Sequence, residues 1–366
     1  MSSSGSLAIV AGSLAAKMGN AGHAWTRISI VLGLRRLGFD VVYVEQLADA
    51  GQAERDHFGG LCARFGFDGY LLTGQPPYEL IARAEAATLL LNVGGHLTFP
   101  ELKRGPRKRI YLDDDPGYTQ LWHQAGLLGD RLAGHEHHFT FAANIGRQGC
   151  SLPVDGIDWL PIWPPVVLDE WPAVDPSGNE FKTVASWRGG YGRVQAGGHL
   201  YGQKAHEFRR FAQLPELTAH SFEIALDIQD ADAADADMMR EHGWRLVDPA
   251  RVAGSLDDFR RYVQGSAAEF SVAQGIYAET RCGWFSDRTT RFLATGRPAL
   301  VQDTGFSDAL PTGEGLIGFT TLEEAVAGVA AIQRDYGAHV ESARAIAKDH
   351  FDSDRVVGRM LEQIGL

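Results

Sequence analysis

The sequence has few cysteines, no long apolar run and a shortage of positive charge. Its three cysteines lie far apart, so they form neither a zinc-ligand spacing nor a disulfide framework, and we expect a reducing compartment. No run of about 18 apolar residues occurs, which argues against a membrane span. Residues 1–7 lack the basic flank of a secretory signal. These absences predict a cytoplasmic protein.

The charge balance argues against a nucleic-acid partner. The chain carries 46 Asp and Glu against 34 Lys and Arg, a formal net charge of -12 at pH 7. Such a chain binds nucleic acid poorly unless a local basic patch compensates. The one dense basic run, residues 103–109, directly precedes a predicted strand and is interpreted as a solvated loop.

The 366 residues suit two domains, each with a core of its own. Short β-branched runs alternate with amphipathic segments, which is typical of parallel sheets with crossover helices. Strands are predicted at residues 7–11, 41–44, 88–92, 109–112, 139–142, 182–186, 222–226, 269–272, 299–302 and 316–319. A proline-rich passage over residues 161–178 is interpreted as the linker. The predicted fold class is α/β, with two doubly wound, Rossmann-like domains that face a ligand-binding cleft.

The strongest motif is RCGWFSD at residues 281–287, which opens a predicted helix that ends in GRP at 296–298. A helix start presents unpaired N–H groups and a partial positive charge, which suit a diphosphate. The motif and the turn after it add a glycine for close approach, two hydroxyls and two guanidinium groups: Gly283, Ser286, Thr289, Arg281 and Arg288. The alternative is an ordinary capped helix with surface arginines.

This motif resembles the donor-binding signature of family 1 nucleotide-sugar glycosyltransferases, where His-Cys-Gly-Trp-Asn-Ser precedes a helix that ends in Gly-x-Pro. Arg281 matches the first position, a phosphate contact in that family, and Ser286 matches the serine. The helix is slightly longer here, and Arg291 falls where the family has its ribose-binding glutamate. The whole chain is also similar to bacterial glycosyltransferases that carry GWFSDR, ATGRP, QDTGFS and LPTGEG segments.

The resemblance implies a metal-independent hexosyltransferase of the GT-B fold. It implies an acceptor domain at residues 1–172, a nucleotide-sugar domain at 173–350, and a C-terminal helix at 351–366 that packs back on the first domain. The donor would be a UDP- or dTDP-sugar, and the acceptor a small molecule of natural-product type. No cofactor and no metal ion would be needed, and a homodimer is compatible with this interpretation.

Two further segments complete the predicted donor site. Arg188 and Lys204 resemble, in placement only, the arginine and lysine that meet the diphosphate in related retaining families, and two cations would offset its charge. The alternative is a flexible glycine-rich loop. Residues 302–306 take the position that contacts the donor sugar in such enzymes. The full predicted donor set is Arg188, Lys204, Arg281, Gly283, Trp284, Ser286, Asp287, Arg288, Thr289, Asp303 and Thr304.

His23 is the predicted general base of an inverting reaction. It lies between the first strand and the first helix, where family 1 enzymes place a Gly-His pair, and imidazole titrates near neutrality. Asp113 and Asp115, from a run of three aspartates, are candidates for the carboxylate that would support it. The alternatives are a capping role for His23 and a metal site at the aspartates.

Four other classes of protein share part of this sequence pattern. An oxidoreductase would need G-x-G-x-x-G after the first strand; Glu45 does end the second strand, but the loop at residues 12–22 is wrongly spaced. A nucleotide-sugar epimerase of the same build and a retaining glycosyltransferase stay open. The presence of Arg281 and His23 argues against a non-enzymatic sugar- or nucleotide-binding protein.

Overall fold

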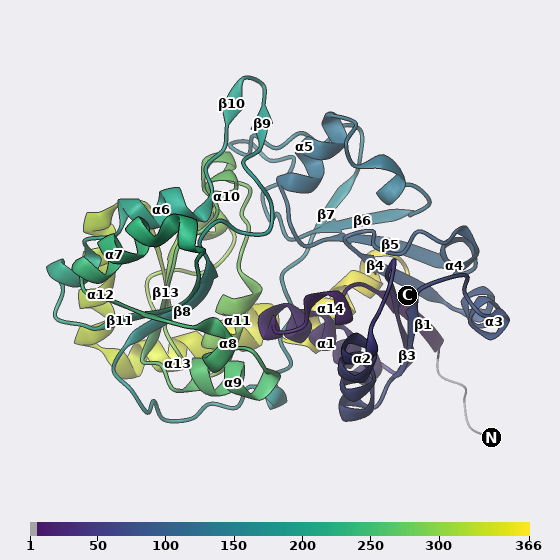
Figure 1. Ribbon diagram of the computed structural model, residues 1–366, viewed down its shortest axis with the longest axis horizontal. Coiled ribbons are helices and arrows are strands. Elements are labelled where there is room, and N and C mark those ends of the chain that lie inside the picture. Colours follow the sequence, from purple (N-terminus) through teal and green to yellow (C-terminus); the bar gives the residue numbers. More distant parts are fainter. Residues whose placement is uncertain (1–5) are drawn as a thin grey trace. The chain divides into compact units, whose positions relative to one another are not determined.

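The computed structural model describes residues 6–366 (Figure 1). The chain divides into two compact units. The first runs to Phe141 and also takes in Pro153–Val167 and Ser353–Leu366, and the second comprises Ala142–Leu152 and Leu168–Asp352. Each unit is built on one parallel β-sheet flanked by helices. The predicted α/β class with two parallel-sheet domains is therefore confirmed.

The sheet of the first unit has seven strands in the order β3-β2-β1-β4-β5-β6-β7, and every pairing is parallel. The strand order reverses between β1 and β4, and ligands of doubly wound sheets bind outside the carboxyl ends of the strands at such a reversal. The strands are β1 (Ser6–Ala11), β2 (Phe39–Gln46), β3 (Asp68–Leu72), β4 (Leu89–Val93), β5 (Lys108–Asp113), β6 (His137–Thr140) and β7 (Trp159–Pro161).

The central strands of this sheet are nearly continuous apolar runs because both of their faces are buried. All five residues of β4 are buried, as are the last four of β1, because helices cover both faces of a parallel sheet. The first helix of this unit stops where the sequence predicts, because Gly38 adopts a φ of 89°, a left-handed conformation that ends helices. The helices are α1 (Ala21–Arg36), α2 (Gln52–Phe65), α3 (Tyr78–Ala86), α4 (Pro100–Arg104) and α5 (Tyr118–Gln124).

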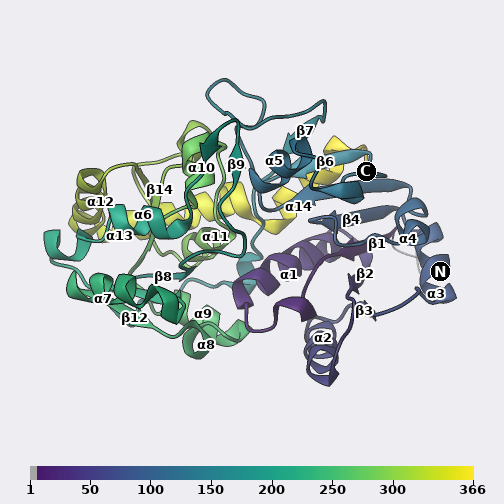
Figure 2. The ribbon, with the colours of Figure 1, turned by 45° about the horizontal axis from the view of Figure 1, so that its top comes forward.

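The last helix of the chain, α14 (Ser353–Gln363), belongs to the first unit. It packs on α1 at Gly33, where a Cβ atom would lie only 2.9 Å from Val357 Cγ2, and Figure 2 shows the two helices side by side. The Ser353 amide donates to Val166 O at 2.9 Å. The end of the chain thus contributes to the core of the unit in which the chain begins.

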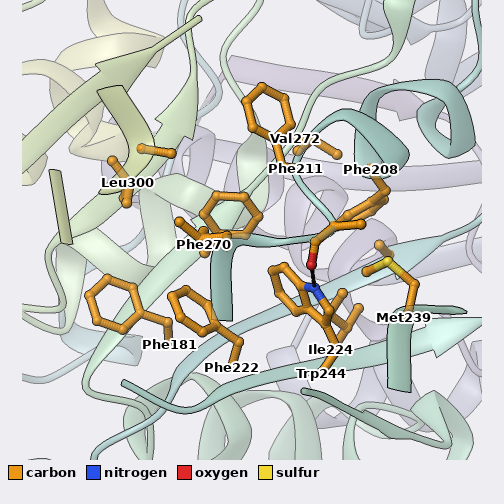
Figure 3. Packing of buried hydrophobic residues seen from close by; sticks show 14 of the residues in the cluster. Phe181, Phe208, Phe211, Phe222, Ile224, Met239, Trp244, Phe270, Val272 and Leu300 are labelled. Atoms are coloured by element: carbon orange, nitrogen blue, oxygen red, sulfur yellow. Dashed lines mark hydrogen bonds between the residues drawn. The ribbon is translucent and has the colours of Figure 1, made fainter. Parts of the chain in front are cut away.

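The sheet of the second unit has six parallel strands in the order β12-β11-β8-β13-β14-β15. Figure 3 shows its aromatic core, where Trp244 Nε1 donates to Ala212 O at 2.7 Å. The strands are β8 (Phe181–Ser186), β11 (Phe222–Asp227), β12 (Trp244–Val247), β13 (Ala268–Ser271), β14 (Ala299–Gln302) and β15 (Leu316–Phe319). The helices are α6 (Lys204–Arg210), α7 (Ala233–Glu241), α8 (Pro249–Val252), α9 (Leu256–Gln264), α10 (Gly275–Thr280), α11 (Asp287–Ala294), α12 (Leu322–Arg334) and α13 (Tyr336–Ile346), and β9 (Gln195–Ala196) and β10 (His199–Leu200) form a small hairpin.

The sequence did not predict β3, β7, β12 or the short hairpin strands β9 and β10. Strand β7 ends at Pro161, inside the passage interpreted as the linker. It is one of the two edge strands of its sheet, and an edge position tolerates proline because one side of the strand needs no donor. Within residues 6–366, no helix is both long enough and apolar enough to span a membrane.

Candidate functional site

A small pocket opens in the second unit where β13 and β14 end and α11 begins. Aromatic rings, hydroxyls and an amide share its wall. Three lining residues, Trp284, Ser286 and Thr289, belong to the predicted donor set. The full lining is Ser271, Val272, Ala273, Trp284, Phe285, Ser286, Thr289, Val301, Gln302 and Phe306.

The start of α11 is an ordinary capped helix N-terminus with an acidic first turn. Ser286 is the N-cap, and its hydroxyl accepts from the Arg288 amide at 3.3 Å. Asp287 follows, and its carboxylate lies 3.0 Å from Arg291 Nη1. Arg291, which falls at the family's ribose position, is fully buried and donates back to the Asp287 carbonyl at 2.5 Å. Its guanidinium therefore stabilises the first turn of α11.

Arg288 makes its contacts inside the unit. Its Nε donates to Glu269 Oε1 at 2.7 Å, Nη1 donates to Val184 O at 2.9 Å, and Nη2 donates to the Ser271 hydroxyl. The Glu269 carboxylate is completely buried, and this burial raises its pKa while Arg288 opposes the shift. These contacts tie β8, β13 and α11 together. Acceptors of the protein itself therefore already occupy Nε, Nη1 and Nη2 of Arg288.

Arg281 differs from Arg288 in both backbone and exposure. It follows α10 with φ 48° and ψ 39°, the left-handed region that non-glycine residues rarely enter. Nearly half of its side chain is exposed, and among residues 6–366 its side-chain partner is Asp308, 3.3 Å from Nη2. Most of its guanidinium donors thus face solvent and are open to an anionic ligand.

Gly283 is required by the protein itself. Its φ is 75°, and a Cβ atom there would lie 3.0 Å from both the Ala143 Cβ and the Asn144 amide nitrogen. Residues 143–144 therefore fill the Cβ side of Gly283, and the close approach of a ligand to its backbone stays a prediction. The next residue, Trp284, stacks on Tyr277 with ring centroids 4.3 Å apart.

The loop after β14 forms hydrogen bonds with the motif at residues 281–287 and within the loop. The Gly283 amide donates to Thr304 O at 2.8 Å, and Thr304 Oγ1 donates to Trp284 O at 2.5 Å. Asp303 accepts from the Gly305 amide at 2.9 Å and from the Ser307 hydroxyl at 2.6 Å. Asp303 and Thr304 therefore shape the loop that carries them.

Arg188 and Lys204 have different surroundings. Arg188 is half-exposed and forms a bidentate ion pair with Asp232, with Nε 2.7 Å from Oδ2 and Nη2 2.6 Å from Oδ1. This pair raises the pKa of Arg188 and lowers the pKa of Asp232. Lys204 begins α6, and its amide donates to Gln274 Oε1 at 2.7 Å. The positive charge of Lys204 also opposes the rise that burial causes in the pKa of Glu269.

His23 lies in the first turn of α1, which Asn20 caps by accepting the His23 amide at 3.1 Å. Its ring Nε2 lies 2.8 Å from both the hydroxyl and the carbonyl oxygen of Ser13, in the loop after β1. Glu45 holds this loop, because its buried carboxylate accepts three successive backbone amides, from residues 14–16, at 2.7–2.9 Å. Glu45 therefore binds backbone where a dinucleotide enzyme would bind ribose.

The three adjacent aspartates do not converge. Asp113 is buried and accepts from the side chains of Thr119, Gln120 and Thr140 at 2.7–2.8 Å; burial raises its pKa to about 6. Asp114 pairs with Arg27 at 2.5 Å, and the Asp115 amide donates to Asp113 at 3.3 Å. No three His, Cys, Asp or Glu side chains in the described part of the chain are arranged to hold a metal ion.

A second histidine that sequence reasoning missed lies at the end of β4. A Cβ atom on Gly94 would be 3.0 Å from His96 Nε2 and 3.8 Å from Asp114 Oδ1, so this ring borders the buried pair of Asp114 and Arg27. Desolvation lowers the pKa of His96. The sequence did carry a signal for this residue. His96 follows the glycine pair 94–95 at the end of a predicted strand, and that strand lies beside the reversal of strand order.

No protein-family model matches the sequence. No curated protein matches it either. Among solved structures, an alpha-glucosyltransferase (AGT) in complex with UDP superposes with a TM-score of 0.65 and 11% identity over 99% of this chain and 100% of that chain. Anabaena Alr3699/HepE, in complex with UDP and glucose, gives 0.60 and 12% over 98% and 99%. The chain has the GT-B fold.

A further GT-B structure, AviGT4, described as a glycosyltransferase involved in avilamycin A biosynthesis, superposes with a TM-score of 0.59 and 13% identity over 98% of this chain and 96% of that chain. The GT-B architecture that the motif resemblance implied is therefore confirmed. In the second unit the structure joins Gly283, Trp284 and Thr304 in one bonded network and places Ser286 and Thr289 at the pocket. The roles of these residues stay predictions.

Proposed function

We propose that this protein is a glycosyltransferase that transfers a sugar from a UDP-sugar to an acceptor hydroxyl. The observation that carries the proposal is the pocket at the start of α11, lined by Trp284, Ser286 and Thr289, on a GT-B chain. The superposable structures of AGT and HepE contain UDP, which favours uridine over other bases. The nucleotide-sugar is a substrate in this proposal, and no cofactor is required.

The donor diphosphate is proposed to lie at the start of α11 beside Arg281. The free amides of a helix start and its partial positive charge stabilise a diphosphate, and an exposed guanidinium adds charge-assisted hydrogen bonds. Lys204 would add a second cation. As the C1–O bond to the diphosphate breaks, negative charge grows on the leaving UDP, and these groups would stabilise it.

His23 is proposed as the general base. Its imidazole would take the proton of the acceptor hydroxyl while that oxygen bonds to C1, so the configuration at C1 inverts. The contacts with Ser13 support the proposal because they fix the ring. Of the two candidate carboxylates, Asp113 already accepts from three side-chain donors.

The acceptor is proposed to be a small molecule. The net charge of -12 argues against a nucleic-acid duplex, although AGT has been solved with DNA. AviGT4, from avilamycin A biosynthesis, supports a natural-product acceptor. A retaining transferase is the second candidate, because AGT is named an alpha-glucosyltransferase and UDP-glucose is itself α-linked. The anomeric configuration of the product decides between the two.

Replacing Arg281 with alanine should weaken UDP binding and leave uridine binding nearly unchanged. A charge-assisted contact contributes about 1.5–3 kcal/mol, and only UDP offers phosphate oxygens to the guanidinium. Isothermal calorimetry with both ligands measures the difference. Arg240→Ala is the matched control, since that arginine is exposed in the same unit and pairs with Asp237 at 2.9 Å. Equal losses for UDP and uridine would rule out a phosphate contact.

Transfer activity should persist when EDTA is added in excess. Arg281, Lys204 and the start of α11 would neutralise the diphosphate, so a divalent ion has no step to perform. Product formation is measured with and without chelator, and again after manganese or magnesium is returned. Activity that EDTA abolishes and either metal restores would contradict metal independence.

A further inference from the structure

The segment Ala142–Leu152 leaves the first unit between β6 and β7 and joins the second. Ala142 pairs with Trp284 as an isolated antiparallel bridge, the Asn144 amide donates to Cys282 O at 2.9 Å, and the Ser151 amide donates to Thr280 O at 3.0 Å. A stretch far away in the sequence therefore runs along the donor motif. Nothing in its composition indicates this placement.

The side chain of Asn144 lies at the centre of this contact. Its Nδ2 donates to Gly305 O at 2.8 Å and also lies 3.3 Å from Arg281 O and 3.4 Å from Asp308 Oδ2. All three neighbours are acceptors, so the NH₂ end of the amide must face them. The residue is 4% exposed, and its Oδ1 is buried without a hydrogen-bond partner. The three acceptors and the burial of the side chain therefore fix the orientation of this amide.

The groups that Asn144 holds are those that set the position of the Arg281 guanidinium. Arg281 has the left-handed φ of 48° and Gly305 has a φ of 95°, and the amide is bonded to the carbonyls of both. A non-glycine residue in this region costs about 1–3 kcal/mol and persists only where its surroundings hold it. Asp308 lies between the Asn144 amide and the Arg281 guanidinium.

We propose that Asn144 is a positioning residue for donor binding. It holds the backbone of Arg281 and the loop of residues 303–308 in one arrangement, so that the guanidinium is oriented before the diphosphate arrives. Preorganisation of this kind raises affinity because the ordering cost is not incurred on binding. The inference rests on the proposed function, since it takes a nucleoside diphosphate as the ligand of Arg281.

Two variants of the full chain test the proposal. Asn144→Ala removes the donor without adding charge, and Asn144→Asp turns a carboxylate oxygen toward three acceptors. Each should weaken UDP binding about 5–30-fold and leave uridine binding within about twofold, the scale of one lost buried hydrogen bond. Asn179→Asp, exposed in the same unit, is the matched control for the added charge. Far-UV circular dichroism and melting temperature identify the variants that fold.

The double variant Arg281→Ala/Asn144→Ala separates positioning from general destabilisation. If Asn144 acts through Arg281, the UDP affinity of the double variant should equal that of Arg281→Ala alone. Additive losses, or equal losses for UDP and uridine in either folded variant, would overturn the proposal. If the unaltered protein binds neither UDP nor a UDP-sugar, the proposed function fails and this inference fails with it. Normal UDP binding by the unaltered protein and by a folded Asn144 variant overturns this inference alone.

Discussion

Replacing His23 with alanine should lower the turnover number about 10²–10⁴-fold and leave the affinity for UDP nearly unchanged. The reason is chemical: without the imidazole, the acceptor hydroxyl attacks C1 while it still carries its proton. The donor residues are proposed on the second unit, whereas His23 lies on α1 of the first, so donor affinity should be unaffected. Steady-state kinetics with a UDP-sugar and an accepted acceptor measure the rate, and calorimetry measures UDP binding.

Two control variants sharpen this test. His57→Ala removes another partly buried histidine of the first unit, on α2, and should leave turnover near that of the unaltered protein. His96→Ala removes the second imidazole beside the β1/β4 reversal. A large rate loss in the His96 variant with normal turnover in the His23 variant would transfer the role of base to His96. Retained configuration at C1, observed by NMR of the product, would remove a general base from the mechanism.

Replacing Glu269 with alanine should lower the free energy of unfolding by about 3–5 kcal/mol, because it leaves the buried charge of Arg288 without its carboxylate. The Glu269 side chain is fully buried, and only 12% of the Arg288 side chain is exposed. The same change removes one of the two side-chain contacts by which Arg288 of α11 holds β13, so the pocket should loosen as well. Urea unfolding followed by tryptophan fluorescence measures the loss.

An exposed ion pair in the same unit gives the matched control. Asp237→Ala breaks the contact between Asp237 and Arg240, whose side chains are 70% and 56% exposed, and should cost less than about 1 kcal/mol. The paired substitution Glu269→Leu with Arg288→Met removes both buried charges and should recover much of the stability lost in Glu269→Ala. A loss below about 1 kcal/mol for Glu269→Ala would show that the buried pair does not hold the unit together.

The local patterns of the sequence were enough for the architecture. Ten predicted strands overlap observed ones, because β-branched runs flanked by glycine and proline are local signals of buried parallel strands. The capped start of α11 at Ser286 was likewise visible as a serine before an amphipathic run. The strands that were missed are β3, β7, β12 and the short hairpin strands β9 and β10. One of them, β7, is an edge strand that ends in proline, where the local signal indicates a linker.

The candidate site followed from the sequence only in part. Motif order placed Trp284, Ser286 and Thr289 at the carboxyl edge of a sheet, because a helix that follows a parallel strand starts at that edge. Arg281 and Arg288 both offered a guanidinium near the same helix start, although only Arg281 also matched the family motif. Burial separates them: Glu269 and two further oxygen acceptors hold Arg288, whereas Arg281 remains nearly half-exposed.

The sequence by itself determined most of the elements, their order along the chain and the chemistry available at the strand ends, because each depends on neighbours within a few turns or one strand. The tertiary structure alone decided which of those groups are already satisfied. Asn144 meets residues 281 and 305, Glu45 accepts the amides of the β1 loop, and Asp113 collects donors from two elements. Such contacts join segments far apart in the chain, and their partners are set by packing and by the need to pair buried polar groups, which a local pattern does not record.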